Sequence, residues 1–241
     1  MKCLIFVFIL SAFFACKKED VDSTNSDKNL SIKFNLKSNA ENLLFDKYVS
    51  YEDDSIKLSD FKFYLSDIKL IGPSSTTLVS DEVLIDLSAQ KEYKFSVKSG
   101  NYTSFSYAIG IPTTKNTSDP SVYENSHALS VFQGMHWNWN SGYKFILLEG
   151  KLKNNQEEFL LAYHTGTDTL YNEKIDTINI EIPSDQSLVQ LNFSIDIEKI
   201  IGAAAFSPIN TISETNTHTT DNFSLANKIT LNLKSELKTN K

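Results

Sequence analysis

Hydrophobic and polar residues alternate along most of the chain, so that every second residue is apolar. The clearest runs are LSIKFNL at residues 30–36 and VQLNFSIDI at residues 189–197. Because successive side chains of a β-strand point to opposite faces, such runs predict strands with one face in the core and one in water. Further strands are predicted at residues 61–71, 83–87, 93–97, 105–109, 143–148, 159–163, 178–182 and 229–233.

Helical periodicity is weak along the chain. Only residues 197–205 and 221–228 are candidates for short helices, and turn-forming residues separate the alternating runs. Many short strands with one dominant alternation are typical of two packed sheets. The pattern predicts an all-β fold, an antiparallel two-sheet β-sandwich with long loops and one or two short helices. The longest loops are expected at residues 112–132 and 208–220, and loops on a rigid sandwich commonly hold the functional residues.

The N-terminus has the pattern of an export signal. Lys2 precedes an apolar run of about a dozen residues, which is too short to span a bilayer and has the length of a secretory signal. The run ends in FAC at residues 14–16, which resembles the cleavage motif of bacterial lipoproteins, in which the cysteine is acylated. We expect residues 1–15 to be removed, Cys16 to hold a lipid anchor, and residues 16–28 to form a flexible tether. The plain alternative is a soluble secreted protein with a spare thiol.

Composition and charge narrow the choice of partners and compartment. Residues 29–241 are enough for one well-filled β-domain, and no internal repeat is visible. The net charge is −7 and every basic residue is lysine, so nucleic-acid binding, which needs a basic patch, is not expected. Loss of Cys3 with the signal leaves no pair for an internal disulfide. We expect a protein anchored by lipid to the outer membrane of a Gram-negative bacterium, facing the periplasm or the outside.

The stretch GMHWNWNSGYKF, residues 134–145, concentrates uncommon residues. It contains both tryptophans of the chain and one of its two methionines. If the stretch is extended, Met135, Trp137 and Trp139 share one face and His136 points to the other. The tryptophans then either cap one end of the core or form the wall of a ligand site.

Histidines are the candidate metal ligands of this chain. His127 and His218 lie in the two long loops, and His164 ends a predicted strand. A single histidine is more often a hydrogen-bonded structural residue than a ligand. The chain has no Gly-x-Ser-x-Gly and no His-Glu-x-x-His motif, so we do not expect an enzyme. For Glu149 we expect a structural hydrogen bond or an ion pair with a lysine such as Lys144.

Several motifs resemble the pattern of the MbnP-like copper-binding proteins, across most of residues 29–235. They are GMHWNWNSGYKF, EG at residues 149–150, YHTG at residues 163–166, FYLSDI at residues 63–68, GIP at residues 110–112, and His218 ahead of Asn222 and Phe223. Two positions depart from the pattern: His136 stands where tyrosine is usual, and Thr167 stands where a second glycine often follows.

The resemblance implies an exported β-sandwich that holds a single copper ion through histidines. The implied ligands are His164, His218 and His127, with His136 in reserve. In some members of the family a partner diheme peroxidase oxidises a tryptophan to kynurenine, so that Trp137 or Trp139 would be the modified residue here, with Met135 beside them. Neutral imidazoles suit both Cu(I) and Cu(II), whereas a closed structural zinc site favours cysteines or four ligands. Zinc is therefore the second choice.

Two other functions stay open on the sequence alone. Trp137 and Trp139 would also suit an aromatic platform for a sugar or peptide, because aromatic faces stack well on apolar ligand faces. An interaction or structural lipoprotein without a small ligand is the other alternative. The separation of His164 and His218 distinguishes these interpretations from copper binding, because only a metal site requires the two histidines to lie together.

Overall fold

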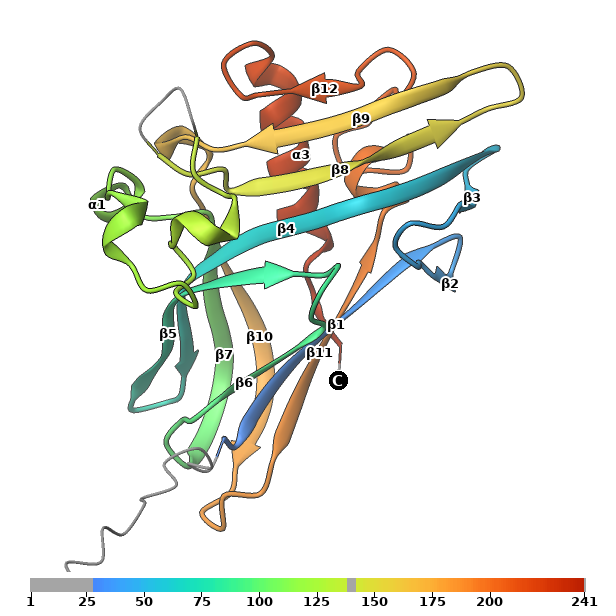
Figure 1. The fold of residues 1–241 in the computed structure, drawn as a ribbon. Coiled ribbons are helices and arrows are strands. Elements are labelled where there is room, and N and C mark those ends of the chain that lie inside the picture. The colour runs from blue at the N-terminus through green and yellow to red at the C-terminus, as the bar shows by residue number, and fades with distance from the viewer. Residues whose placement is uncertain (1–27, 138–141, 241) are drawn as a thin grey trace, which may run out of the picture.

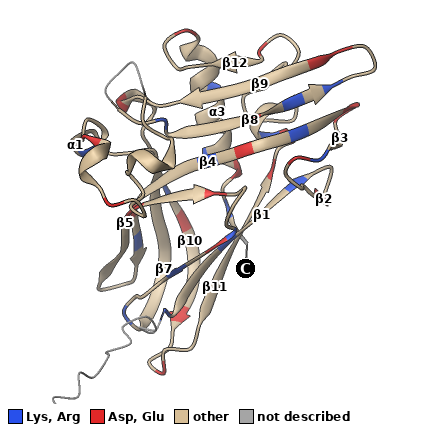
Figure 2. Ribbon diagram, in the orientation of Figure 1, with Lys and Arg blue, Asp and Glu red and all other residues tan. Residues whose placement is uncertain are grey.

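The computed structural model describes residues 28–137 and 142–240, and the structural statements below concern these residues (Figure 1). The predicted signal, Cys16, nearly all of the tether and Trp139 lie outside them. Strands dominate the described chain and form two sheets, so the predicted all-β, two-sheet fold is confirmed. Among the described residues no helix is both long and apolar enough to cross a membrane. Acidic and basic residues are interspersed along the strands (Figure 2).

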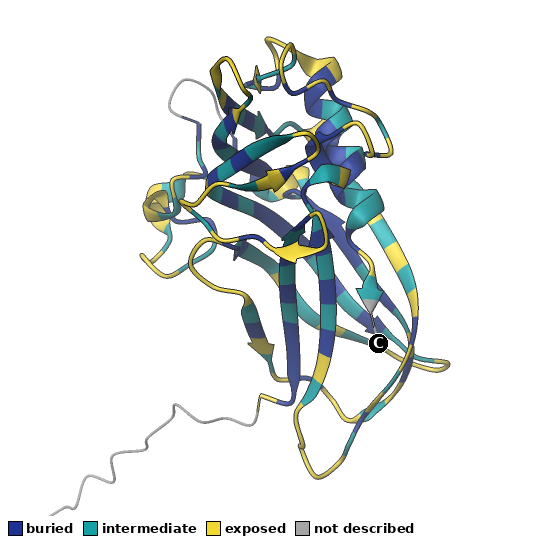
Figure 3. Cartoon of the chain, turned by 90° about the vertical axis from the view of Figure 1, so that its right-hand side faces the viewer, coloured by how far each residue is buried: buried dark blue, intermediate teal, exposed yellow. Residues whose placement is uncertain are grey.

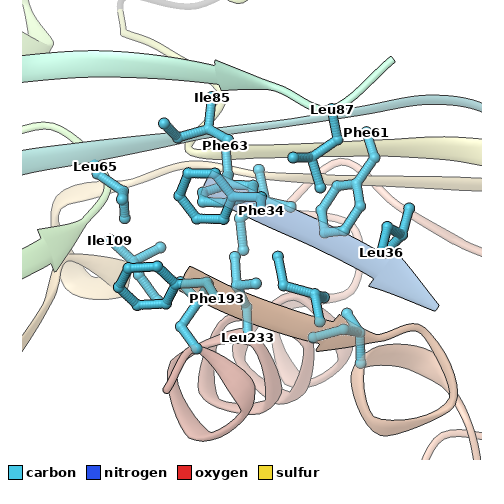
Figure 4. Packing of buried hydrophobic residues seen from close by; sticks show 14 of the residues in the cluster. Phe34, Leu36, Phe61, Phe63, Leu65, Ile85, Leu87, Ile109, Phe193 and Leu233 are labelled. Atoms are coloured by element: carbon cyan, nitrogen blue, oxygen red, sulfur yellow. The ribbon is translucent and has the colours of Figure 1, made fainter. Parts of the chain in front are cut away.

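The smaller sheet is organised around a parallel pair of strands. It contains β1 (Leu30–Ser38), β2 (Glu41–Asn42), β6 (Glu92–Phe95), β11 (Val189–Asp196) and β13 (Thr239–Asn240). β1 and β11 run parallel in register, so that Phe34 lies opposite Phe193 and the two rings stack with centroids 5.2 Å apart. Figure 4 shows both rings inside the main core. The predicted strands are present, but this pair is parallel rather than antiparallel. Alternation predicts which face of a strand is buried, and it does not predict the direction of the neighbouring strand.

The larger sheet is built along β4 (Asp54–Ile71). Its other strands are β3 (Val49–Tyr51), β5 (Thr76–Asp86), β7 (Gly100–Ile109), β8 (Ile146–Lys153), β9 (Glu158–Thr165), β10 (Asn172–Ile182) and β12 (Asn216–Thr217). All of its pairings are antiparallel except that of β12 with β9. Figure 3 shows buried and less buried residues alternating along the strands, as expected for a sheet with one face in the core.

β7 and β8 follow one another along the same edge of β4 and meet at Tyr64. The amide of Gly110 donates to the Tyr64 carbonyl at 3.0 Å, and the Tyr64 amide donates to the Phe145 carbonyl at 3.0 Å. The connection over residues 110–145 therefore leaves and returns at one point of the sheet. It contains α1 (Thr113–Asn116) and two single-turn 3-10 helices, η1 (Pro120–Val122) and η2 (Val131–Gln133).

This connection covers one end of the outer face of the larger sheet. Phe63 and Leu148 belong to the main core between the sheets, whereas the adjacent Tyr64 and Leu147 belong to a second, smaller cluster. Since neighbouring residues of a strand face opposite sides, the second cluster lies on the outer face. Its members are Tyr64, Ile111, Leu129, Met135, Tyr143, Phe145, Leu147, Leu170 and Ala226.

The C-terminal helix overlaps the short helix predicted at residues 221–228 and continues through residues 229–233, where a strand was predicted. The remaining helices are η3 (Asp168–Leu170), α2 (Glu198–Ile201) and α3 (Phe223–Glu236), so the predicted strand at residues 229–233 is wrong. Leu225, Ile229 and Leu233 are four residues apart, and as one face of a helix they all enter the main core. The Asn222 side chain caps the helix by accepting from the Leu225 amide at 3.2 Å. The cap and this spacing favour a helix, and they outweigh the short alternation in ITLNL, residues 229–233, that predicted a strand.

Candidate metal site

His164 and His218 lie side by side at the end of β9. The short strand β12 runs parallel to β9 with Thr217 opposite Tyr163, and the residue that follows each of them in the chain is one of the two histidines. Their ring centroids are 5.2 Å apart and the ring planes meet at 82°. The structure thus brings together two of the three histidines that were expected to bind metal.

The Thr219 side chain connects the loop that contains His218 with the end of β9. Its hydroxyl donates to the His164 carbonyl at 3.1 Å and accepts from the Gly166 amide at 2.9 Å. Thr219 is buried and has a left-handed backbone with φ of 72°, which is uncommon for a β-branched residue. These hydrogen bonds hold the two histidine-bearing segments in a fixed relation.

The imidazole of His164 is largely buried, with a side chain 12% exposed. Its Nε2 lies 2.8 Å from Oε1 of Glu149. Its Nδ1 is buried and has no hydrogen-bond partner among the described residues. Burial lowers the pKa of His164 and the charge of Lys144 acts in the same direction, while Glu149 opposes them. The environment favours a neutral ring, which is the form that binds metal ions.

His218 lies nearer to solvent and is held by Asp221. Its Nδ1 is 3.0 Å from Oδ2 of Asp221, and its backbone amide donates to Oδ1 of the same carboxylate at 2.7 Å. Partial burial opposes ionisation of Asp221, but the hydrogen bonds from His218 outweigh it and lower the pKa of the carboxyl group. The His218 side chain is 41% exposed, so this histidine lies on the solvent side of the pair.

Trp137 forms a wall beside His164. The indole is 5% exposed, and its ring centroid lies 6.2 Å from that of the His164 ring. Lys144 stands over the indole with Nζ 5.6 Å from the ring centroid, and Nζ also donates to the Gly134 carbonyl at 2.9 Å. Met135 is fully buried in the second cluster. Met135 and Trp137 are therefore both buried, and Trp139, which was predicted to share their face, lies outside the described residues.

The other two histidines make different contacts. His127 stacks on Tyr123 at 4.3 Å between centroids, lies 3.7 Å from Oε1 of Glu82, and accepts through Nδ1 from the Leu129 amide at 3.0 Å. The ring of His136 meets the ring of Tyr143 edge-on at 5.0 Å. Within residues 28–137 and 142–240, no three His, Cys, Asp or Glu side chains are grouped so as to hold a metal ion. The pair of His164 and His218 is therefore the candidate site.

The sequence did not reveal that two carboxylates, Glu149 and Asp221, contact these imidazoles. A hydrogen bond was expected for Glu149, but its partner is His164 rather than a lysine. The register of β8 with β9 places His164 opposite Leu147, so that Glu149, two residues further along β8, shares its face. That relation depends on pairing across a hairpin, whereas Asp221 is detectable from its position three residues after His218.

The family comparison agrees with the motifs. A family model for MbnP matches residues 27–231. The chain belongs to the MbnP family. A structure search matches MbnP from Methylosinus trichosporium, with 12% sequence identity, a TM-score of 0.46, and coverage of 70% of this chain and 76% of that chain. No curated protein matches the chain.

One motif of this MbnP family member has a clear steric reason. In YHTG, a Cβ on Gly166 would lie 2.1 Å from the Tyr143 carbonyl oxygen and 2.8 Å from Cα of Lys144. Glycine therefore permits the close approach of the segment that holds Trp137 and Lys144 to the end of β9. The motif brings the tryptophan segment and His164 together.

Proposed function

We propose that this protein binds a single copper ion at His164 and His218, with Trp137 as the adjoining wall. The observation that supports the site is the pair of imidazoles with ring centroids 5.2 Å apart, one of which has a buried Nδ1 without a hydrogen-bond partner among the described residues. A buried polar atom without a partner is costly, and a metal ion is one of the groups that relieves that cost.

The donor set suits copper. Two imidazoles without a thiolate match the preference of copper for nitrogen ligands, and they withstand an oxidising compartment. A closed structural zinc site needs four protein ligands, and the described residues group no three candidate side chains, so zinc is again the second choice. His127, with its contacts to Tyr123 and Glu82, is left out of the proposed ligand set.

Export, lipid anchoring and tryptophan oxidation are proposed from the sequence motifs and the family resemblance. The protein is exported, anchored by lipid on Cys16 to the outer membrane, and acts as a copper binder or carrier rather than an enzyme. Trp137 or Trp139 is the substrate of a partner diheme peroxidase that oxidises it to kynurenine. Kynurenine adds an aromatic amine next to a ketone, which is a better donor set than the indole N–H.

The aromatic-platform alternative is disfavoured by the burial of Trp137. A platform must present a ring face to its ligand, whereas Trp137 is 5% exposed, with Lys144 over its ring and the His164 ring beside it. The closeness of His164 and His218 also favours a metal site over a platform.

Copper titration of the mature domain tests the proposal. We expect about one equivalent to bind, with affinity reduced strongly in His164→Ala and His218→Ala, because each variant removes one of two donors. His136→Ala is the matched control and should bind as the unmodified protein does. Unaltered affinity in His164→Ala would refute the proposed site. Metal analysis and the mass of the Trp137–Trp139 peptide, from protein isolated from its own envelope, test the identity of the metal and the oxidation.

A further inference from the structure

Glu149 approaches His164 across the β8–β9 hairpin. The two side chains lie on the same outer face of the larger sheet, two residue pairs apart along the hairpin. Oε1 of Glu149 is 2.8 Å from Nε2 of His164, a normal distance for a charge-assisted hydrogen bond. Both backbones belong to regular strands, so the geometry is set by the sheet rather than by a loop.

This hydrogen bond decides which ring nitrogen of His164 bears the proton. A carboxylate only accepts hydrogen bonds, so Nε2 is the N–H donor of the pair. In a neutral imidazole the other nitrogen then has the lone pair. That nitrogen, Nδ1, is buried and has no hydrogen-bond partner among the described residues. The unprotonated nitrogen of the His164 ring, which has the lone pair, is thus the buried one.

We propose that Glu149 is a positioning residue, which fixes His164 as the Nε2–H tautomer and so presents Nδ1 as its copper-binding nitrogen. The inference rests on the proposed copper site and goes beyond it by assigning the ligand atom and the residue that selects it. Carboxylates that accept from the distal N–H of a histidine ligand fix the ring orientation and raise its basicity. Glu149 occupies that position relative to His164.

Three features of the surroundings support this role over direct ligation by Glu149. Nε2 already faces the carboxylate, so an ion between them would have to displace the hydrogen bond. The His218 ring meets the His164 ring edge to face, so a second imidazole already adjoins His164 as a possible ligand. The Glu149 side chain is 42% exposed, whereas Nδ1 of His164 is buried.

Nitrogen-15 NMR of the metal-free mature domain tests the tautomer without any assumption about copper. Long-range proton–nitrogen correlations distinguish the protonated from the unprotonated ring nitrogen of each histidine. We expect His164 to be the Nε2–H tautomer in the unmodified protein and in Glu149→Gln, whose amide oxygen still accepts the hydrogen bond. In Glu149→Leu this preference should be lost. An Nδ1–H tautomer in the unmodified protein would overturn the proposal.

Titration with Cu(I), which is diamagnetic, tests the ligand atom. We expect the nitrogen-15 shift of His164 Nδ1 to move most and Nε2 to move least. Affinity should fall by about 10–100-fold in Glu149→Leu, the range typical of such supporting partners, and less in Glu149→Gln. Glu157→Gln, on the exposed turn after β8, is the matched control and should bind unchanged.

The outcomes separate this inference from the proposed function. If the unmodified protein binds no copper, the copper site fails, and the tautomer in the metal-free domain still tests the role of Glu149. If copper binds and the largest shift is at Nε2, or Glu149→Leu binds as tightly as the unmodified protein, the assignment of Glu149 is wrong while the copper site stands.

Discussion

The rings of His164 and His218 lie 5.2 Å apart at an angle of 82°, although 54 positions separate the residues in the sequence. Two backbone pairings of β12 with β9 produce this closeness, and the Thr219 hydroxyl reinforces it by joining the His164 carbonyl to the Gly166 amide. The geometry of the candidate site therefore depends on a few contacts at the edge of the larger sheet.

Replacing Thr219 with valine should loosen this edge. Valine keeps the shape of the side chain but leaves the Gly166 amide without its acceptor, so we expect a loss of about 1–3 kcal/mol in the free energy of unfolding and weaker copper binding. Thr219→Ser retains the hydroxyl and is the control. The measurements are urea denaturation and copper titration. Equal stability of the valine and serine variants would show that the hydroxyl does not hold the site.

Gly166→Ala should be far more harmful than Gly134→Ala. The new Cβ would lie 2.1 Å from the Tyr143 carbonyl oxygen at position 166, whereas at position 134 no atom of the described residues, apart from the chain neighbours, lies within 4 Å of it. Gly134 has a left-handed φ of 69°, so alanine there costs only about 1 kcal/mol. We expect Gly166→Ala to lose more than about 2 kcal/mol in thermal or urea unfolding. Similar losses in both variants would contradict the close approach of the tryptophan segment to β9.

Much of the fold follows from alternation, but the relations across strands do not. The pattern of Phe34 and Phe193 identifies two strands with a shared buried face, yet it is the same for parallel and antiparallel pairs. The segment at Ile229 alternates briefly, but the Asn222 cap and the packing of Ile229 with Leu225 and Leu233 in the core favour a helix. Local sequence does not encode which strand lies next to which.

In the candidate site, too, the residues of the motifs were predictable, and the contacts that depend on strand pairing were not. The motifs identified His164, His218 and Trp137, which the structure places around one point. The partner of Glu149 required the register of a hairpin, and the surroundings of His127 required the path of a long connection. Side chains that act through a neighbour are the part of a site that a single sequence reveals least.

The ion pair of Glu214 with Lys228 predicts a pH dependence of stability. Oε1 of Glu214 is 2.8 Å from Nζ of Lys228, and Oε2 accepts from the Asn210 amide at 3.0 Å. Partial burial opposes ionisation, but these contacts outweigh it and lower the pKa of Glu214. The unfolded chain then binds the proton more readily, so the stabilisation is complete above the ordinary glutamate pKa of about 4.3 and is lost as the pH falls through the lower, folded value.

Urea unfolding between about pH 6 and about pH 3, limits that lie about 1.5 units on either side of the ordinary glutamate pKa, measures this change in stability. Glu214→Gln should lose less stability on acidification than the unmodified domain. Glu157→Gln, an exposed residue of the β8–β9 turn, should follow the unmodified curve. A Glu214→Gln curve parallel to that of the unmodified domain would show that this carboxyl group does not contribute to acid sensitivity.

Lipid anchoring predicts that replacing Cys16 changes membrane association and that replacing Cys3 does not. Cys16→Ser should release the exported protein from membranes, because the lipid on this residue is the anchor that the sequence predicts. Cys3→Ser changes a residue that is removed with the signal, so that variant should stay with the membrane fraction. Membrane fractionation followed by detection of the protein makes the comparison. Cys16→Ser that still sediments with membranes would rule out this anchor.

We propose that His164 and His218 bind one copper ion between them. The most direct test is anomalous diffraction at the copper absorption edge from crystals of the copper-loaded mature domain. We expect one peak at about 2 Å from a nitrogen of each ring, with Nδ1 as the nitrogen of His164. A peak beside His127, or one in contact with only one of the two imidazoles, would contradict it.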